Sequence, residues 1–325
     1  MPSNVSSVYV IVVNFNGSAI LDECLTALQQ QRLNSIEIMV VDNGSTDDSI
    51  ALIRNNYPSV KLIALDKNEG FAKAHNIALE QALKENPQAI AFVNTDAVLH
   101  PDWLPSVLGF MEGSEFDLVQ TLIVRHDNPG RIDSAGIGVS RSLKIYDRQN
   151  GRSARSVEED REIFGPCFAA AAFRARVFQS LRDDHGYLDE TFGSFYEDVD
   201  FCFRANLAGY KSALLADPLC RHRRSFTADR TPFRKYFYLG RNYFLVLAKH
   251  IPSIALLKNL PALLFDRLTF VLRTIGHPRY FCGFALGSII GAVRLTAFKL
   301  SVKGRTRKRD GSSGLLRKIK KGDYE

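Results

Sequence analysis

The chain has 325 residues, of which 46% are hydrophobic, so it can bury a substantial core as one enlarged domain with appendages or as two domains. Its five cysteines stand at scattered spacings without a C-x-x-C pair, so the sequence indicates neither a disulfide framework nor a zinc knuckle. The net charge of +7 comes largely from a basic C-terminal tail. Because only this tail and the basic pI suggest nucleic-acid binding, we expect no nucleic-acid partner.

The first hundred residues alternate short β-branched runs with helical patterns. The runs are apolar at nearly every position rather than at every second one, which means that both faces of each strand are covered. This pattern is typical of a parallel sheet between helix layers and predicts a doubly wound α/β domain. The predicted strands are 8–13, 36–41, 60–65 and 89–93, and the predicted helices are 20–31, 47–55 and 71–84.

Polar loops follow all four predicted strands, as NFNG at 14–17, DNGSTD at 42–47, KNEGF at 67–71 and NTD at 94–96. In such a sheet these loops share one edge, where ligands bind. Turn and helix-cap chemistry explains one such loop more easily than four in succession. No G-x-G-x-x-G or P-loop motif is present, which argues against a dinucleotide dehydrogenase or an ATPase. A divalent cation on Asp96 is then the natural counter-charge for a phosphate-bearing ligand.

A second acidic site, Glu197-Asp198, lies far downstream in the run FGSFYEDVDF at 192–201. Two separate carboxylate sites suggest metal-assisted group transfer with its own general base. The same pair also suits a helix start, where acids gain about 0.3 to 1 kcal/mol from the helix dipole, and both interpretations can hold. Between the two sites, the polar, Gly-containing segment 125–160 is expected to form a mobile loop near the ligand.

Taken together, these motifs resemble the family 2 inverting glycosyltransferases, and among them the bacterial rhamnosyltransferase-type enzymes of surface polysaccharide assembly. The resemblance covers about residues 6–250. It implies a GT-A type, nucleotide-sugar-binding α/β fold with a mixed, mostly parallel sheet and a divalent metal ion, Mg²⁺ or Mn²⁺. The motifs that carry it are VVNFN at 12–16, VVDNGSTD at 40–47, NEGFAKAHN at 68–76, NTD at 94–96 and FYED at 195–198.

The resemblance also implies roles for single residues. Asp42 matches the position that contacts the nucleobase or ribose, and Asp96 matches the metal-binding acid of a D-x-D motif whose first acid is here Asn94. His222 matches a second metal ligand, although the arginines around it offer a metal-free way to bind diphosphate. Arg241 matches a phosphate or acceptor contact, with a structural salt bridge as the alternative. The expected nucleotide-sugar-binding set is completed by Asn14, Asn16, Asn43, Asn68, Gly70, Asn76 and Thr95.

In the mechanism that the resemblance implies, Asp198 takes the proton from the acceptor hydroxyl and Glu197 assists it. Tyr196 and Asp200 are the expected acceptor contacts. The expected donor is dTDP-L-rhamnose, with a UDP-sugar of another hexosyl or galactofuranosyl transferase as the alternative. The expected acceptor is a cell-surface or polyprenyl-linked glycan. Two other classes fit less well, since a nucleotidyltransferase needs a Gly-rich basic loop and a non-catalytic glycan- or membrane-binding protein needs no such set of acids.

After a catalytic domain at 1–250, the sequence divides into an amphipathic helical region at 251–302 and a basic tail at 303–325, which we expect to be disordered. The longest uncharged run of the helical region, 280–293, is shorter than the roughly 20 residues that span a bilayer. We therefore expect peripheral membrane attachment, with helix packing on the domain or in a homo-oligomer as the alternative. The apolar run 8–13 is too short for a secretory signal, so we expect the cytoplasmic face of the cell membrane.

Overall fold

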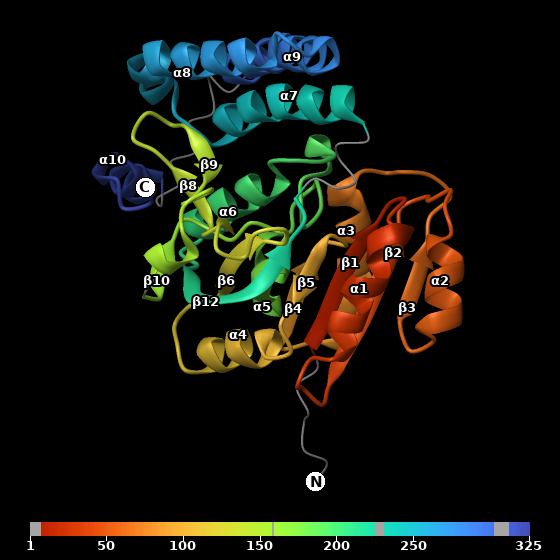
Figure 1. Ribbon diagram of the computed structural model, residues 1–325. Helices are drawn as coiled ribbons and strands as arrows, with labels where there is room; N and C mark the ends of the chain where they lie inside the picture. Colours follow the sequence, from red (N-terminus) through yellow and green to blue (C-terminus); the bar gives the residue numbers. More distant parts are fainter. Residues whose placement is uncertain (1–7, 158, 225–230, 302–311) are drawn as a thin grey trace.

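The centre of the molecule is a mixed sheet of ten strands in the order β10-β12-β6-β11-β4-β1-β2-β3, with β5 paired to β12 and β7 paired to β6. The computed structural model describes residues 8–157, 159–224, 231–301 and 312–325 (Figure 1). The strands of this sheet are β1 Val8–Asn14, β2 Ile36–Asp42, β3 Lys61–Ala64, β4 Ala89–Val93, β5 Ala97–Leu99, β6 Leu118–Arg125, β7 Ile132–Ser134, β10 Arg161–Ile163, β11 Ala170–Arg174 and β12 Ser212–His222.

One half of the sheet is the predicted parallel unit. β4, β1, β2 and β3 are neighbours and all run parallel, while β11 lies antiparallel between β4 and β6. Helices connect the parallel strands, as expected for right-handed crossovers, and the fold is the α/β class that the sequence predicted. The helices of the catalytic part are α1 Ser18–Gln29, α2 Ser49–Asn56, α3 Phe71–Ala82, α4 Trp103–Glu112, α5 Ala175–Leu181 and α6 Glu197–Leu207, with short 3-10 turns at Leu83–Glu85, Ala154–Ser156 and Glu190–Phe192.

Both faces of the central strands are buried, which explains their continuous apolar runs. Along β1, Val10 and Val12 belong to the core on one face of the sheet, whereas Tyr9 and Ile11 belong to the core on the other face. Alternate residues of a strand point to opposite faces, so an unbroken apolar strand is stable only between two helix layers. This arrangement places every polar strand-end loop at the carboxyl edge of the parallel unit.

The segment 125–160, expected as a mobile loop, contains three short strands among turns. It contains β7 and a separate two-stranded antiparallel sheet of β8 Ile137–Val139 and β9 Ile145–Asp147. The short strands escaped the sequence analysis because each has only three residues and shows no measurable periodicity.

The C-terminal helices form a layer of their own. They are α7 Pro232–His250, α8 Ser253–Thr274 and α9 Pro278–Ser301. In Figure 1, α8 and α9 lie at the top of the molecule, with α7 between them and the catalytic part. The expectation that no segment is long enough to span a bilayer needs correction, because α9 is long and apolar enough over 278–300 by length and composition. The uncharged run ends at Val293, but the apolar helix continues beyond it, since Arg294 and Lys299 are tolerated near a helix end.

The expectation of a disordered tail is wrong for its described part. Residues 302–311 lie outside the described residues, but Ser312–Lys321 forms the helix α10. Leu315, Ile319 and Tyr324 are buried, and they join the hydrophobic core of the catalytic part. The basic residues therefore occupy one side of an amphipathic helix, a pattern that a count of charges overlooks.

Candidate active site

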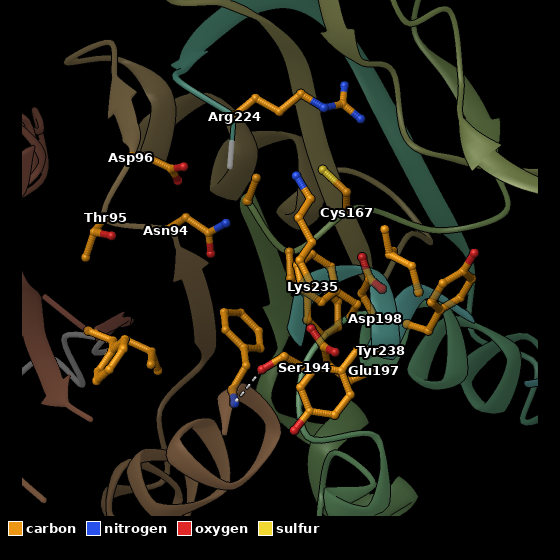
Figure 2. A pocket seen from close by; sticks show the side chains of 18 of the residues that line it. Asn94, Thr95, Asp96, Cys167, Ser194, Glu197, Asp198, Arg224, Lys235 and Tyr238 are labelled. Carbon is orange, nitrogen blue, oxygen red and sulfur yellow. Dashed lines mark hydrogen bonds between the residues drawn. The ribbon is translucent and has the colours of Figure 1, made fainter. Parts of the chain in front are cut away.

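A cavity of about 480 Å³ opens between the carboxyl edge of the parallel strands and helices α6 and α7. Figure 2 shows Asn94, Thr95 and Asp96 on one side of it and Glu197 and Asp198 on the other. The two acidic sites, a hundred residues apart in sequence, thus face one space. Nine of the residues expected from the sequence line this cavity, namely Asn43, Asn68, Asn94, Thr95, Asp96, Tyr196, Glu197, Asp198 and His222.

The loops after β2 and β3 are tied together beside the cavity. Asn43 Nδ2 donates to the Gly70 carbonyl at 3.2 Å, and Asn43 Oδ1 accepts from the Glu69 amide at 2.8 Å. Gly70 has a φ of 92°, and a Cβ built there would lie 3.0 Å from the Gly193 carbonyl oxygen. Only glycine permits both this backbone conformation and this close approach. The β3 loop therefore touches the loop that precedes Glu197-Asp198.

Other expected donor contacts lie behind the cavity wall. The fully buried Asp42 accepts from Asn14 Nδ2 at 2.7 Å and from the Ser45 amide at 2.8 Å. Asn16 Oδ1 accepts from the Thr46 amide at 2.7 Å. Asn76 is bound to both the carbonyl and the amide of Leu188, at 2.8 Å each. Asp42, Asn14, Asn16, Gly70 and Asn76 do not line the cavity, so a direct contact between them and a nucleotide stays a prediction.

Asp96 meets His222, 126 residues away in sequence, at the cavity wall. His222 comes from the end of β12, which pairs with β5 directly after Asp96, and its Nε2 lies 3.0 Å from Asp96 Oδ1. Its Nδ1 lies 2.7 Å from Asp133 Oδ2. Burial opposes the charged imidazolium, but the two carboxylates outweigh it and raise the pKa of His222 to about 10. Asp133 comes from β7 and was missed by the sequence analysis.

Arg224 extends this network to a third strand. Its guanidinium donates to Asp133 Oδ1 at 2.7 Å and also to Asp147 Oδ2. Asp147 ends β9 and lines the cavity with Arg224 and Asp133. Burial raises the pKa of Asp147, and the charge of Arg224 opposes the rise. The hairpin of β8 and β9 thus supplies a cavity acid that no sequence motif marked.

Glu197 and Asp198 open the first turn of α6. Phe195 and Tyr196 before them both have left-handed backbone, with φ of 66° and 70°, and this turns the pair toward the cavity. Burial, then the neighbouring Asp198, raises the pKa of Glu197 well above its usual range, and its Oε2 has no hydrogen-bond partner among the described residues. Burial likewise raises the pKa of Asp198 to about 7. A carboxylate with that pKa can accept a proton near neutral pH.

The strained turn is held by α7. The buried Asn242 side chain donates to the carbonyls of Phe192, Ser194 and Phe195, at 2.9, 2.9 and 2.7 Å. Its neighbour Arg241 donates to the Phe192 carbonyl at 2.7 Å and does not line the cavity. We therefore correct the role expected for Arg241, because its guanidinium is engaged with loop carbonyls and not with the cavity.

The expected acceptor contact Asp200 also needs correction. This fully buried carboxylate is surrounded by Arg204 Nε at 2.9 Å, Lys249 Nζ at 2.6 Å and His250 Nε2 at 2.8 Å, and it does not line the cavity. Burial alone would raise the pKa of Asp200, but these three neighbours outweigh it and hold the pKa well below its usual range. Asp200 therefore joins α6 to α7.

Basic and aromatic side chains from the first turns of α7 complete the cavity wall. Arg234, Lys235 and Tyr238 line it, and Figure 2 shows Lys235 and Tyr238 beside Ser194 and the acidic pair. Arg234 lies over the Tyr238 ring, 5.6 Å from its centroid. In the sequence these residues stand in the run RKYFY at 234–238, shortly before Arg241, and none of them was among the expected site residues.

Residues 9–182, more than half of the chain, match the sequence profile of glycosyl transferase family 2. The chain belongs to this family. Among its curated relatives, the dTDP-rhamnosyl transferase RfbF of Shigella flexneri is 24% identical over 264 residues, 77% of this chain and 83% of that protein. The O-antigen chain rhamnosyltransferase RfbN of Salmonella typhimurium is 24% identical over 244 residues, 71% of this chain and 70% of that protein.

Solved structures of glycosyltransferases share the GT-A-like fold. Staphylococcus aureus TarS in complex with UDP-GlcNAc has a TM-score of 0.56 at 17% identity, covering 97% of this chain and 92% of that one. The mannosyltransferase PcManGT of Pyrobaculum calidifontis, in complex with GDP-Man and Mn²⁺, has a TM-score of 0.53 at 17% identity, covering 100% of this chain and 89% of that one. The family 2 chain described here is thus a glycosyltransferase of GT-A-like fold.

Proposed function

We propose that this protein transfers a sugar, with inversion, from a nucleotide-sugar to a hydroxyl of a lipid-linked or surface glycan. The donor in this proposal is dTDP-L-rhamnose, and the transferred sugar is L-rhamnose. One observation carries the proposal. A single cavity is bounded by the polar strand-end loops of the sheet and, opposite them, by an acid whose pKa is raised to about 7. The similarity to rhamnosyltransferases supports dTDP-L-rhamnose as the donor, and a UDP-sugar is the alternative. A non-catalytic binding protein would not need the acid.

Asp198 is the base in this proposal. An acceptor hydroxyl beside Asp198 attacks the anomeric carbon of the donor, and its proton passes to the Asp198 carboxylate. The new bond joins the acceptor oxygen to the anomeric carbon, while the bond from that carbon to the diphosphate oxygen breaks and its electrons leave with the nucleoside diphosphate. Burial and the neighbouring Asp198 raise the pKa of Glu197 well above its usual range, so in this proposal Glu197 stays protonated and donates a hydrogen bond to the acceptor. The aromatic ring of Tyr196 offers an apolar face on which a sugar ring of the acceptor can stack.

The residues fit a divalent ion, Mg²⁺ or Mn²⁺, held by Asp96 and His222. Asp96 Oδ1 and His222 Nε2 meet at 3.0 Å, and an ion between them would replace the proton on Nε2. Asp133 on the other ring nitrogen supplies the carboxylate that commonly orients a ligating histidine. No cluster of three or more His, Cys, Asp or Glu side chains suited to a metal occurs in the described ranges, so donor phosphates and water would complete the ligand set. Such an ion neutralises charge on the leaving diphosphate.

The donor's nucleoside belongs, in this proposal, at the loops after β1, β2, β3 and β4. Asn43, Asn68, Asn94 and Thr95 present polar groups to the cavity there. Asp42, Asn14, Asn16, Gly70 and Asn76 support these loops from behind, and any direct contact to base or ribose requires the loops to rearrange. The enzyme would work at the cytoplasmic face of the cell membrane on a polyprenyl-linked glycan, as a monomer or a homo-oligomer.

The base assignment is tested with Asp198→Asn. Release of nucleoside diphosphate from a panel of purified nucleotide-sugars would first identify the donor. Transfer by the variant should then fall about 10² to 10⁴-fold while donor affinity by calorimetry stays unchanged. In the wild type, transfer should rise with pH through about 7, because Asp198 acts only when deprotonated. The exposed Asp127→Asn is the matched control. Full turnover by Asp198→Asn would refute the assignment of Asp198 as the general base.

The metal is tested by chelation. Excess EDTA should stop transfer, and Mg²⁺ or Mn²⁺ should restore it in the wild type but weakly in Asp96→Asn. Undiminished transfer in EDTA would instead support phosphate binding by Arg224 and Arg234 without a metal.

A further inference from the structure

The exposed apolar side chains of this molecule concentrate on two helices. Of the fourteen large hydrophobic side chains that are exposed in the described residues, all but Phe233 lie between Ile254 and Leu300, in α8, α9 and the turn between them. A contiguous apolar surface of this kind marks a binding surface on a soluble domain. The catalytic cavity uses none of these residues.

On α8 the exposed residues form one stripe. Leu257, Leu264, Leu268 and Leu272 are 55 to 66% exposed and recur at spacings of four or seven residues, so they share one face of the helix. An adjacent face of α8 carries Arg267, whose guanidinium lies 3.8 Å from the centroid of the Tyr243 ring of α7. This face attaches α8 to the protein and leaves the leucine stripe outside.

α9 has two faces of different character. Gly283, Gly287 and Gly291 pack against the α7 backbone, where a Cβ on Gly287 would lie 2.1 Å from the Phe237 carbonyl oxygen. Ile289 and Val293 are more than 60% exposed and lie on the other side of the helix. α9 is therefore fixed along one side and exposed along the other.

The charges around these faces have one sign. Lys258, Arg273, Arg279 and Arg294 are exposed, whereas Asp266, the one acid of 253–300, is half-buried beside Arg267. The sequence continues with five more basic residues between 303 and 309. A second copy of this chain would bring like charges together in a symmetric dimer, but an anionic lipid surface complements both the charge and the apolar stripes.

We propose that the outer faces of α8 and α9 lie flat on an anionic lipid surface, with the leucine stripe in the interface, and that α9 does not cross the bilayer. This inference deepens the membrane attachment proposed above and rests on it. Although α9 is long enough to span, its glycine face is occupied by α7, which carries Arg234, Lys235 and Arg241. Insertion of α9 would either strip it from α7 or draw these cations into hydrocarbon.

The geometry has a consequence for the reaction. One side of α7 packs on α9, and its first turns line the cavity with Arg234, Lys235 and Tyr238. Membrane binding would thus hold the cavity at a fixed position near the headgroups, within reach of an acceptor glycan carried on a lipid.

Vesicle flotation of the full chain tests this inference. The wild type should float with vesicles of phosphatidylglycerol and phosphatidylethanolamine and much less with vesicles of phosphatidylcholine alone. A double variant, Leu264→Glu with Leu268→Glu, should bind the anionic vesicles at least about ten-fold more weakly, because two charges then enter the apolar interface. Two added acids on the catalytic part, Gln81→Glu with Gln179→Glu, match the charge change and should bind as the wild type does.

Three results would overturn the inference. If the double leucine variant floated with anionic vesicles as well as the wild type does, the leucine stripe would not be the membrane-binding surface. If the wild type stayed in cell membranes after an alkaline carbonate wash, α9 would be a spanning helix. A dimer in light scattering that the leucine variant converts to monomer, without vesicle binding by the wild type, would show that a second copy covers the face. Nucleotide-sugar binding by calorimetry on the same variants reports separately on the transferase proposal, since neither leucine lines the cavity.

Discussion

Two acids of α6, Glu197 and Asp200, lie one turn apart in opposite electrostatic surroundings. Glu197 is buried, one of its carboxylate oxygens has no hydrogen-bond partner in the described parts of the chain, and burial raises its pKa well above the usual range. Asp200 is buried among Arg204, Lys249 and His250, which hold its pKa below the usual range. Ionised Glu197 therefore destabilises the folded state, whereas ionised Asp200 stabilises it.

This contrast predicts opposite effects on stability. Asp200→Asn should lower the free energy of unfolding at pH 7 by about 3 to 5 kcal/mol, because it leaves buried cations uncompensated. Since the pKa of Asp200 is depressed, the loss relative to wild type should shrink as the pH falls below about 4. Glu197→Gln should instead match or exceed the wild type at pH 8, because the raised pKa makes ionisation costly there. Denaturant titrations at several pH values measure both, and destabilisation by Glu197→Gln would contradict the assignment.

At this scale the sequence predicted the acids that stand in local motifs. Asp96 follows a strand and Asp198 begins a helix, so each was identified by its neighbours along the chain. Asp133 and Asp147 were missed because their role depends on His222 and Arg224, which approach them only after β12 has paired with the sheet. Arg241 was misassigned for the same reason, since its partners are carbonyls fifty residues away.

At the scale of elements, the contact between α7 and α9 depends on a column of small residues. Gly283, Gly287 and Gly291 are spaced by four residues, and each meets an α7 carbonyl or Cα at a distance that leaves no space for a Cβ. The spacing is visible in the sequence, but the partner helix is not, because a stripe of small residues fits any helix that can approach closely. The parallel sheet was predictable since continuous apolar strands require cover on both faces.

Gly287→Ala therefore should not behave as a helix-stabilising change. Alanine is usually better than glycine in a helix by about 1 kcal/mol, but here its methyl group would push α9 from α7, and we expect a net loss of about 1 to 3 kcal/mol. Gly109→Ala in α4 is the matched control, because nothing lies within 4 Å of the added Cβ. Thermal melting should move down for the first variant and stay level or move up for the second. If both variants changed the melting temperature in the same direction, the close contact between α7 and α9 would be excluded.

At the scale of the whole molecule, the chain returns to its catalytic part after the layer of α8 and α9. Tyr324 is 2% exposed, its ring meets Phe164 edge to face, and its hydroxyl lies 3.2 Å from Asn206 Oδ1 at the end of α6. The Arg141 amide, between β8 and β9, donates to Glu325 at 2.8 Å. The C-terminal segment thus contacts both α6, which carries Asp198, and the hairpin that carries Asp147.

This docking predicts that Tyr324→Ala is costly. Loss of a buried aromatic side chain should lower the free energy of unfolding by about 3 kcal/mol, and the hairpin should exchange its amide hydrogens faster because its anchor is gone. Arg317→Ala, on the exposed side of α10, should change stability by less than about 0.5 kcal/mol. Denaturant unfolding and hydrogen exchange measure the two effects. A tail without structure, as its basic composition suggested, would make both substitutions silent, so the difference between them decides whether 312–325 belongs to the fold.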